Sequence, residues 1–137
     1  MKLICLALTL LLLSSVKCQS QFIKDLLKKM TVEDKCGQMT QITFDVITKA
    51  GPLADPNENP VNETKLLEAI RDKRVGSILN TPFNTAQLAK TWQAIIKTIQ
   101  DQALSYNLKI PILYGLDSIH GANYIREATL FPQPISM

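Results

Sequence analysis

The stretch from Val75 to Tyr114 begins with VGSIL at residues 75–79 and ends with IPILY at residues 110–114. Both segments are short, mostly apolar runs, which is the pattern of buried strands, and Pro111 is tolerated because it lies at the start of its strand. An apolar stripe between them predicts an amphipathic helix with Asn84 or Thr85 as its N-cap. That stripe consists of Leu88, Trp92, Ile95, Ile96, Ile99 and Ala103. A strand, a helix and a strand at this spacing predict a βαβ unit, and such units build parallel sheets.

The chain upstream of this unit also alternates between helix and strand. Apolar residues at i, i+4 spacing between lysines predict a short amphipathic helix over residues 22–30. The pattern TVED at residues 31–34 resembles a capping box, and the helix that follows is expected to place Cys36 on its apolar face, in the core. The alternation of Ile42, Phe44 and Val46 with other residues predicts a strand beginning at Gln41.

A loop and a helix connect this strand to the βαβ unit. Residues 48–62 are polar and contain glycine and three prolines, which is typical of a surface loop. Asn62 or Glu63 then opens a helix with an apolar face. Three strands that alternate with helices predict an α/β fold with a parallel sheet. Because such a sheet needs cover on both faces and neighbours at its edges, we expect the chain to be the first, incomplete part of a larger α/β domain.

The N-terminus has the features of a secretory signal peptide in their usual order. A basic start at Lys2 is followed by an apolar run over residues 3–13 and a polar stretch of small residues. Val16 and Cys18 satisfy a small-x-small rule, so residues 1–18 are expected to be the signal peptide and residues 19–137 the mature chain. The alternative is a membrane anchor, but the run of 11 residues is well short of the roughly 20 that span a bilayer. No membrane association is therefore expected after cleavage.

Removal of the signal peptide changes the charge and the cysteine content. The formal net charge of the 137 residues is +3, and the loss of Lys2 and Lys17 lowers it to +1. Most of the basic excess therefore lies in the signal peptide, and no nucleic-acid partner is expected. Cys36 becomes the only cysteine, so it is either buried and inert or lacks a partner. The triplet NET at residues 62–64 is a glycosylation sequon on Asn62, which supports export through a eukaryotic secretory route.

The loop after the third strand, GLDSIHGAN at residues 115–123, holds a carboxylate, the only histidine of the chain, an amide and two glycines. In parallel α/β folds, binding sites lie where strands end. The carboxylate of Asp117 can accept hydrogen bonds from two neighbouring sugar hydroxyls, or Asp117 can cap a helical turn that starts at Ser118, and the residues alone leave both open. His120 has no second histidine or cysteine nearby, which favours a structural role over a metal site. Gly115 and Gly121 predict backbone positions that a side chain would crowd.

Motif searches find no nucleotide-binding glycine pattern, P-loop, serine elbow or zinc helix. No cofactor and no metal ion are therefore expected. Paired carboxylates for glycoside hydrolysis cannot be recognised by spacing in this chain.

Several blocks of the chain resemble glycoside hydrolase family 3. MTVEDKCGQMTQ at residues 30–41 resembles the opening helix of that family, usually M-T-x-E-E-K-x-G-Q-M, and GSIL at residues 76–79 is similar to its second-strand motif. The strongest match is IPILYGLDSIHG at residues 110–121, continued by ATLFPQ at residues 128–133. After this block the family continues toward a run of small residues, whereas this chain reads PISM at residues 134–137.

The resemblance is to the β-glucosidase type, and it implies that the chain is the first part of a TIM-like (β/α) barrel. It implies that the whole protein removes terminal non-reducing β-D-glucosyl residues from a β-glucoside or oligosaccharide, with retention at the anomeric carbon. Asp117 is then expected to bind sugar hydroxyls in the first subsite, and His120 to support the loop structurally. The aspartate nucleophile and the glutamate acid/base are expected beyond Met137, with the rest of the barrel and a second domain. The chain alone is therefore predicted to be inactive.

Two other interpretations stay open at this point. The whole protein could be a β-xylosidase or an exo-glucanase of the same family. It could also be a non-catalytic, degenerate secreted copy. Export is expected to end outside the cell or in a lysosome.

Overall fold

The structure is a computed structural model that describes residues 21–51, 55, 57–106 and 108–132. The chain divides into two compact units, Met1–Glu33 and Asp34–Met137. In the described part of the first unit, residues 21–29 are helical, which confirms the helix expected there. The predicted signal peptide, residues 1–18, lies outside the described residues.

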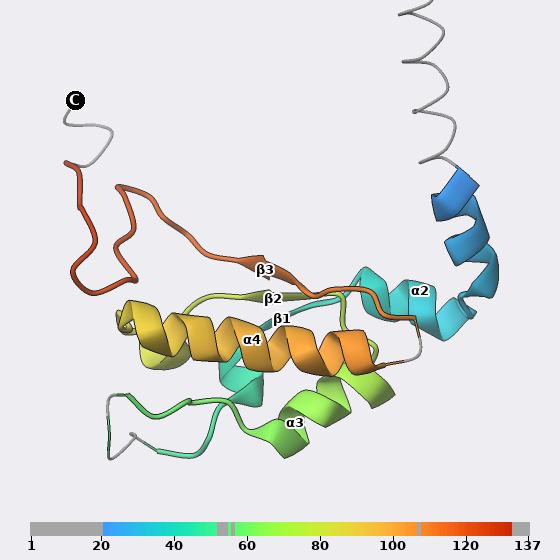
Figure 1. Cartoon of the computed structure of the whole chain (residues 1–137), viewed down its shortest axis with the longest axis horizontal. Helices are drawn as coiled ribbons and strands as arrows, with labels where there is room; N and C mark the ends of the chain where they lie inside the picture. The colour runs from blue at the N-terminus through green and yellow to red at the C-terminus, as the bar shows by residue number, and fades with distance from the viewer. Residues whose placement is uncertain (1–20, 52–54, 56, 107, 133–137) are drawn as a thin grey trace, which may run out of the picture. The chain divides into compact units, whose positions relative to one another are not determined.

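The second unit contains a three-stranded parallel sheet in the order β1-β2-β3 (Figure 1). The strands are β1 (Gln41–Thr43), β2 (Ser77–Leu79) and β3 (Leu113–Gly115). The helix α3 (Glu63–Leu67), continued by a π-helical turn over Glu68–Asp72, connects β1 to β2, and α4 (Ala89–Ser105) connects β2 to β3. The predicted α/β organisation with parallel strands is therefore confirmed.

The core lies between the sheet and its two connecting helices. In Figure 1 both α3 and α4 are drawn below the strands. One row of residues across the sheet joins Ile42, Ile78 and Tyr114 in register, and all three belong to the core or pack against it. From α4, the predicted apolar stripe supplies four buried residues, Trp92, Ile95, Ile99 and Ala103. The stripe is therefore confirmed as the face of α4 that packs on the sheet.

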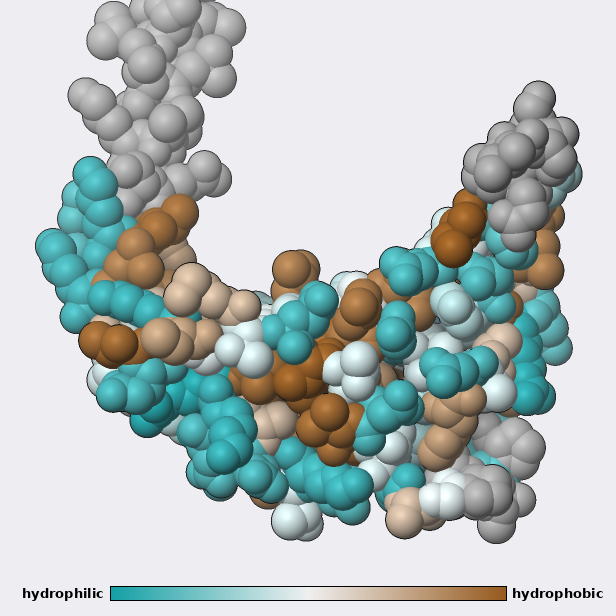
Figure 2. Space-filling model, turned by 180° about the vertical axis from the view of Figure 1, so that it is seen from behind, coloured by the Kyte–Doolittle hydropathy of each residue, from teal (hydrophilic) through white to brown (hydrophobic). Residues whose placement is uncertain are grey.

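The opposite face of the sheet carries exposed apolar residues. Because side chains alternate along a strand, Leu113 and Gly115 point away from the row that contains Tyr114. Leu113 is 72% exposed whereas Ile112 is buried, so the expectation that residues 110–114 form a buried strand is met only in part, and the strand itself covers Leu113–Gly115. Figure 2 shows apolar side chains gathered near the middle of the face that it presents, between polar ones.

The helix α2 (Val32–Gln38) buries a different face from the one predicted. Cys36 is exposed, as are Val32 and Met39, so the assignment of Cys36 to the core is wrong. The buried residue of α2 is Gly37, because the helix approaches residues 73–74 so closely that a Cβ at Gly37 would lie 2.4 Å from the carbonyl oxygen of Arg74. The packing contact of this seven-residue helix is therefore backbone to backbone, and apolar periodicity does not report such a contact.

Two further local predictions differ from the structure. The strand expected from Gln41 ends at Thr43, and Phe44–Ile47 form a 3-10 turn whose buried residues are Phe44 and Ile47, three positions apart. The N-cap of α4 is Leu88, whose hydrocarbon side chain cannot form a cap hydrogen bond, and the predicted Asn84 ends a separate 3-10 turn, Pro82–Asn84, upstream. By contrast, Asn62 is the N-cap of α3, as expected.

Across the described ranges, no helix is both long enough and apolar enough to cross a membrane.

Candidate functional site

The carboxyl ends of β2 and β3 are tied together by two hydrogen bonds. The hydroxyl of Tyr114 donates to the backbone oxygen of Asn80 at 2.5 Å, and the backbone N–H of Asn80 donates to the oxygen of Gly115 at 3.1 Å. Asn80 has φ +76°, a conformation that asparagine tolerates better than most residues. Burial raises the pKa of Tyr114, so its phenol stays protonated and can donate this bond at neutral pH.

Tyr114 is also packed between aromatic rings below the sheet. Its ring centroid lies 5.7 Å from that of Trp92 and 6.4 Å from that of Phe44, both in edge-to-face geometry. Such pairs contribute about 0.5–1.5 kcal/mol beyond the area they bury. Tyr114, the residue before the GLDSIHGAN loop, is therefore held by the packing of its ring and by the hydrogen bond of its hydroxyl.

The segment after β3 is anchored to the residues that precede α4. The backbone N–H of Gln87 donates to the oxygen of Tyr124 at 3.0 Å, and the N–H of Arg126 donates to the oxygen of Gln87 at 2.8 Å. The indole Nε1 of Trp92 also donates to the oxygen of Tyr124, at 2.9 Å. The loop that carries Asp117 thus returns to the sheet edge at a fixed place rather than projecting freely.

Asp117 lies two residues beyond β3, with an exposed side chain. In this described segment no helix begins at Ser118, so the capping alternative for Asp117 is not seen. Its backbone oxygen accepts from the side-chain amide of Asn123 at 3.3 Å, with the amide nitrogen oriented toward it; the same nitrogen donates to Gly121 at 3.0 Å. The carboxylate makes no hydrogen bond or ion pair with any described residue, which leaves both oxygens able to accept bonds from a ligand.

The two glycines of the loop stand where a side chain would collide. Gly121 has φ +101°, and a Cβ there would lie 2.7 Å from the backbone oxygen of Thr129. At Gly115 a Cβ would lie 2.9 Å from Cδ1 of Leu79. His120 between them is half-buried, and its backbone oxygen accepts from Phe131 at 2.8 Å. Among the described residues its buried Nδ1 has no hydrogen-bond partner.

Sequence reasoning did not identify the anchoring residues Asn80, Gln87 and Tyr124, because their bonds are made by backbone atoms of segments far apart in the chain. It also passed over Asp45, an exposed carboxylate that follows β1 at the same edge of the sheet. The rule that polar residues after parallel strands gather at one edge would have found it. Within the described ranges, no group of three or more His, Cys, Asp or Glu residues could hold a metal ion.

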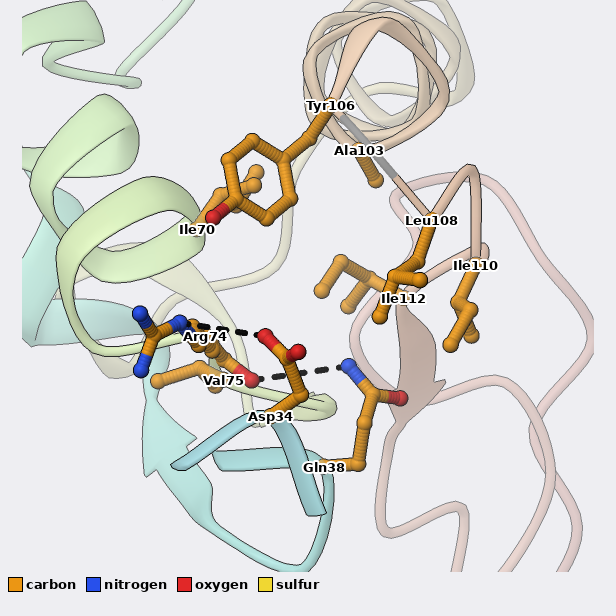
Figure 3. A pocket seen from close by; sticks show the side chains of 10 residues that line it. All are labelled: Asp34, Gln38, Ile70, Arg74, Val75, Ala103, Tyr106, Leu108, Ile110 and Ile112. Atoms are coloured by element: carbon orange, nitrogen blue, oxygen red, sulfur yellow. Dashed lines mark hydrogen bonds and ion pairs between the residues drawn. The ribbon is translucent and has the colours of Figure 1, made fainter. Parts of the chain in front are cut away.

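A small cavity lies at the other edge of the sheet, where β2 and β3 begin (Figure 3). It measures about 20 Å³, which is room for about one water molecule. Its polar groups bind one another: Arg74 Nε lies 3.1 Å from a carboxylate oxygen of Asp34, and the amide of Gln38 donates to the oxygen of Arg74 at 3.4 Å. We therefore assign this cavity to the packing of α2 on the sheet and place the candidate site at the carboxyl edge.

These features describe an α/β protein with a parallel sheet, the class of fold in which ligand sites commonly lie beyond the carboxyl ends of the strands. Residues 31–137 match the family described as "Glycosyl hydrolase family 3 N terminal domain". The chain therefore belongs to glycosyl hydrolase family 3.

Two curated relatives support this assignment. A lysosomal beta glucosidase of Dictyostelium discoideum is 38% identical over 119 residues, which cover 81% of this chain and 14% of that protein. A periplasmic beta-glucosidase of Salmonella typhimurium is 35% identical over 112 residues, covering 81% of this chain and 11% of that protein. The chain thus spans less than a sixth of the length of either relative.

Proposed function

We propose that this chain is the N-terminal part of a secreted, retaining β-glucosidase, in which Asp117 binds hydroxyls of the terminal glucose. The observation that carries the proposal is the place of Asp117: an exposed carboxylate without a protein partner among the described residues, just past β3 in a loop anchored at Tyr124. The names of the two relatives, both β-glucosidases, support the choice of substrate.

In this proposal the three strands are the first part of a TIM-like barrel. The exposed side of Leu113 and the uncovered edge of β3 would be covered by the remaining strands. The aspartate nucleophile and the glutamate acid/base would come from chain that follows Met137. In a retaining glycosidase that pair stands about 5–5.5 Å apart and forms, then hydrolyses, a glycosyl-enzyme.

Asp117 would contribute binding energy rather than covalent chemistry. A hydrogen bond to an ionised group contributes about 1.5–3 kcal/mol, and a carboxylate can accept from two adjacent hydroxyls. Energy from contacts remote from the reacting carbon raises the rate when it is realised in the transition state. The two bonds together would be worth about 3–6 kcal/mol, or about 10²–10⁴ in kcat/KM.

We also propose that the protein leaves the cytosol through cleavage of a signal peptide after Cys18, to the outside of the cell or to a lysosome. The relatives are named as a lysosomal and a periplasmic enzyme, and both of those compartments lie outside the cytosol. The signal-peptide features of residues 1–18 supply the route.

The experiment is to substitute Asp117 in the whole protein and to measure hydrolysis of an aryl β-glucoside. Asp117→Ala should lower kcat/KM by about 10²–10⁴, and Asp117→Asn, which retains one acceptor oxygen, by about 10–100-fold. Asp101→Asn is the charge-matched control, because among the described residues Asp101 forms an ion pair with Lys97 alone, on the exposed side of α4, and its replacement should leave kcat/KM unchanged. Full activity of Asp117→Ala would refute the proposed role. If the wild-type protein preferred an aryl β-xyloside, the proposed glucoside substrate would be wrong, but the proposed role of Asp117 in binding sugar hydroxyls would still stand.

A further inference from the structure

The segment around Asn62 carries a modification signal on the surface of the second unit. Asn62-Glu63-Thr64 is the only Asn-x-Ser/Thr triplet without proline in the 137 residues. Glu63 and Thr64 are exposed and Asn62 is half-buried, at the junction between the polar loop and α3. The triplet therefore lies on the surface, where it is accessible as an acceptor for an N-linked glycan.

The side-chain amide of Asn62 has one orientation in the structure. Its Oδ1 accepts the backbone N–H of Lys65 at 3.1 Å, which makes Asn62 the N-cap of α3. The amide nitrogen Nδ2 must then point the other way, and in the described part of the chain no acceptor takes a hydrogen bond from it. The backbone of Asn62 is fixed as well, because its N–H donates to the oxygen of Ile47 at 2.8 Å and its oxygen accepts from Leu66 at 2.9 Å.

We propose that Asn62 carries an N-linked glycan and continues to cap α3 after modification. Nδ2 forms a bond to the anomeric carbon of a polyisoprenyl-diphosphate-linked oligosaccharide, the bond from that carbon to the diphosphate breaks, and Nδ2 loses one proton. The side-chain carbonyl is untouched by this reaction. The bond from Lys65 to Oδ1 therefore survives, and glycosylation and helix capping are compatible at the same residue.

The surface beside Asn62 has room for the first sugar. An open depression of about 320 Å³ is lined by Lys49, Asn59, Val61, Asn62 and Glu63. Its walls are fixed, since the amide of Asn59 donates to the hydroxyl of Thr98 at 2.9 Å and Lys49 Nζ lies 2.6 Å from a carboxylate oxygen of Glu58. Amide, ammonium and carboxylate groups around an open depression can exchange hydrogen bonds with sugar hydroxyls. A glycan on Nδ2 would therefore meet a polar surface without displacing any part of the fold.

The test is translation of the chain in the presence of eukaryotic microsomes, because the acceptor is read on the growing chain and does not require the folded protein. Wild type should show a single upward shift in gel mobility that an amidase specific for N-glycans removes. Asn62→Asp keeps a capping oxygen but lacks the acceptor nitrogen, and Thr64→Ala keeps Asn62 but breaks the sequon. Both variants should lose the shift completely. Asn57→Asp, an exposed loop asparagine outside any sequon, is the matched control and should keep it.

Protection from added protease reports translocation independently of the glycan. A protected chain with no mobility shift would overturn the proposal. A chain that is not protected would show that the predicted signal peptide fails, and the same three variants are then tested behind a cleavable signal peptide from another protein. A shift that persists in Asn62→Asp would also overturn the proposal, because the glycan would then lie on another residue. None of these outcomes depends on β-glucosidase activity.

Discussion

Replacement of Gly121 by alanine should destabilise the loop that carries Asp117 more than any other single methyl group added to it. Two costs combine at this position. An L-residue in a left-handed conformation such as φ +101° costs about 1–2 kcal/mol, and the new Cβ would stand 2.7 Å from the oxygen of Thr129, a backbone atom that cannot rotate away. Overpacking of this kind costs about 1–3 kcal/mol, so the expected sum is about 2–5 kcal/mol.

Gly51 and Gly115 separate the two costs. Gly51 has φ +77°, and among the described residues nothing lies within 4 Å of its Cβ position, so Gly51→Ala should lose only the conformational part, about 1–2 kcal/mol. Gly115→Ala meets Cδ1 of Leu79 at 2.9 Å, the end of a flexible side chain, and should cost less than Gly121→Ala. The free energies of unfolding of the three variants, from urea titration of the chain, give the order directly.

The catalytic consequence should follow the same order in the whole protein. Displacement of the backbone at Gly121 would move Asp117 away from the sugar that we propose it binds, so kcat/KM should fall for Gly121→Ala while Gly51→Ala stays near wild type. Equal unfolding free energies for Gly121→Ala and Gly51→Ala, within about 0.5 kcal/mol, would refute the steric argument.

Three further outcomes are expected. The 137-residue chain by itself should hydrolyse no aryl β-glucoside, and turnover above that of a mock preparation would contradict the assignment of the nucleophile and acid/base to later residues. Cys36, the only cysteine of residues 19–137, should react with a thiol reagent without denaturant because it is exposed. If its thiol reacted only after the protein was unfolded, Cys36 would instead be buried in the core. Burial raises the pKa of Tyr114 above its ordinary value of 10.0, so the stability that this group contributes is present below pH 10 and is lost as the pH rises above it. In the Tyr114→Phe variant the free energy of unfolding, measured by urea titration at several pH values, should therefore fall less steeply above pH 10. An unchanged dependence on pH would contradict this role of Tyr114.

The elements that the sequence predicts best are those with long, regular patterns. The stripe from Trp92 to Ala103 spans three turns, and the structure buries it as expected. The two-turn helix α2 offers too few apolar positions to define a face, and its close contact at Gly37 is made by backbone atoms. The 3-10 turn at Phe44–Ile47 could not be predicted from the sequence either, because apolar residues that alternate over a few positions fit a strand as well as a turn.

The candidate site is predictable in one respect and not in another. The rule that ligands bind beyond the carboxyl ends of parallel strands brings Asp117 to attention without any structure. The contacts that hold its loop, from Gln87 and Trp92 to the backbone of Tyr124, join segments more than thirty residues apart. They use a main-chain oxygen that every residue possesses, so no residue type marks them in the sequence. The wrong N-cap for α4 has another origin, because Asn84 ends a separate 3-10 turn, Pro82–Asn84, and the side chain of Gln87 donates back to the oxygen of Pro82 at 3.3 Å.

The alternation of β3 connects the hydrophobic core to the proposed chemistry. Tyr114 points to the helices, where Trp92 and Phe44 hold its ring, so its neighbours Leu113 and Gly115 face the other side of the sheet. Asp117 lies two residues beyond Gly115, and no helical turn intervenes. Because side chains two residues apart on an extended chain point to the same side, Asp117 is expected to face the same side as Gly115. The position of the Tyr114 ring therefore predicts that the carboxylate of Asp117 emerges on the side of the sheet away from the helices. On that side Leu79 lies so close that a Cβ at Gly115 would stand 2.9 Å from its Cδ1. The same residues that stabilise the sheet edge thus orient the only group of the GLDSIHGAN loop that we propose to touch the sugar.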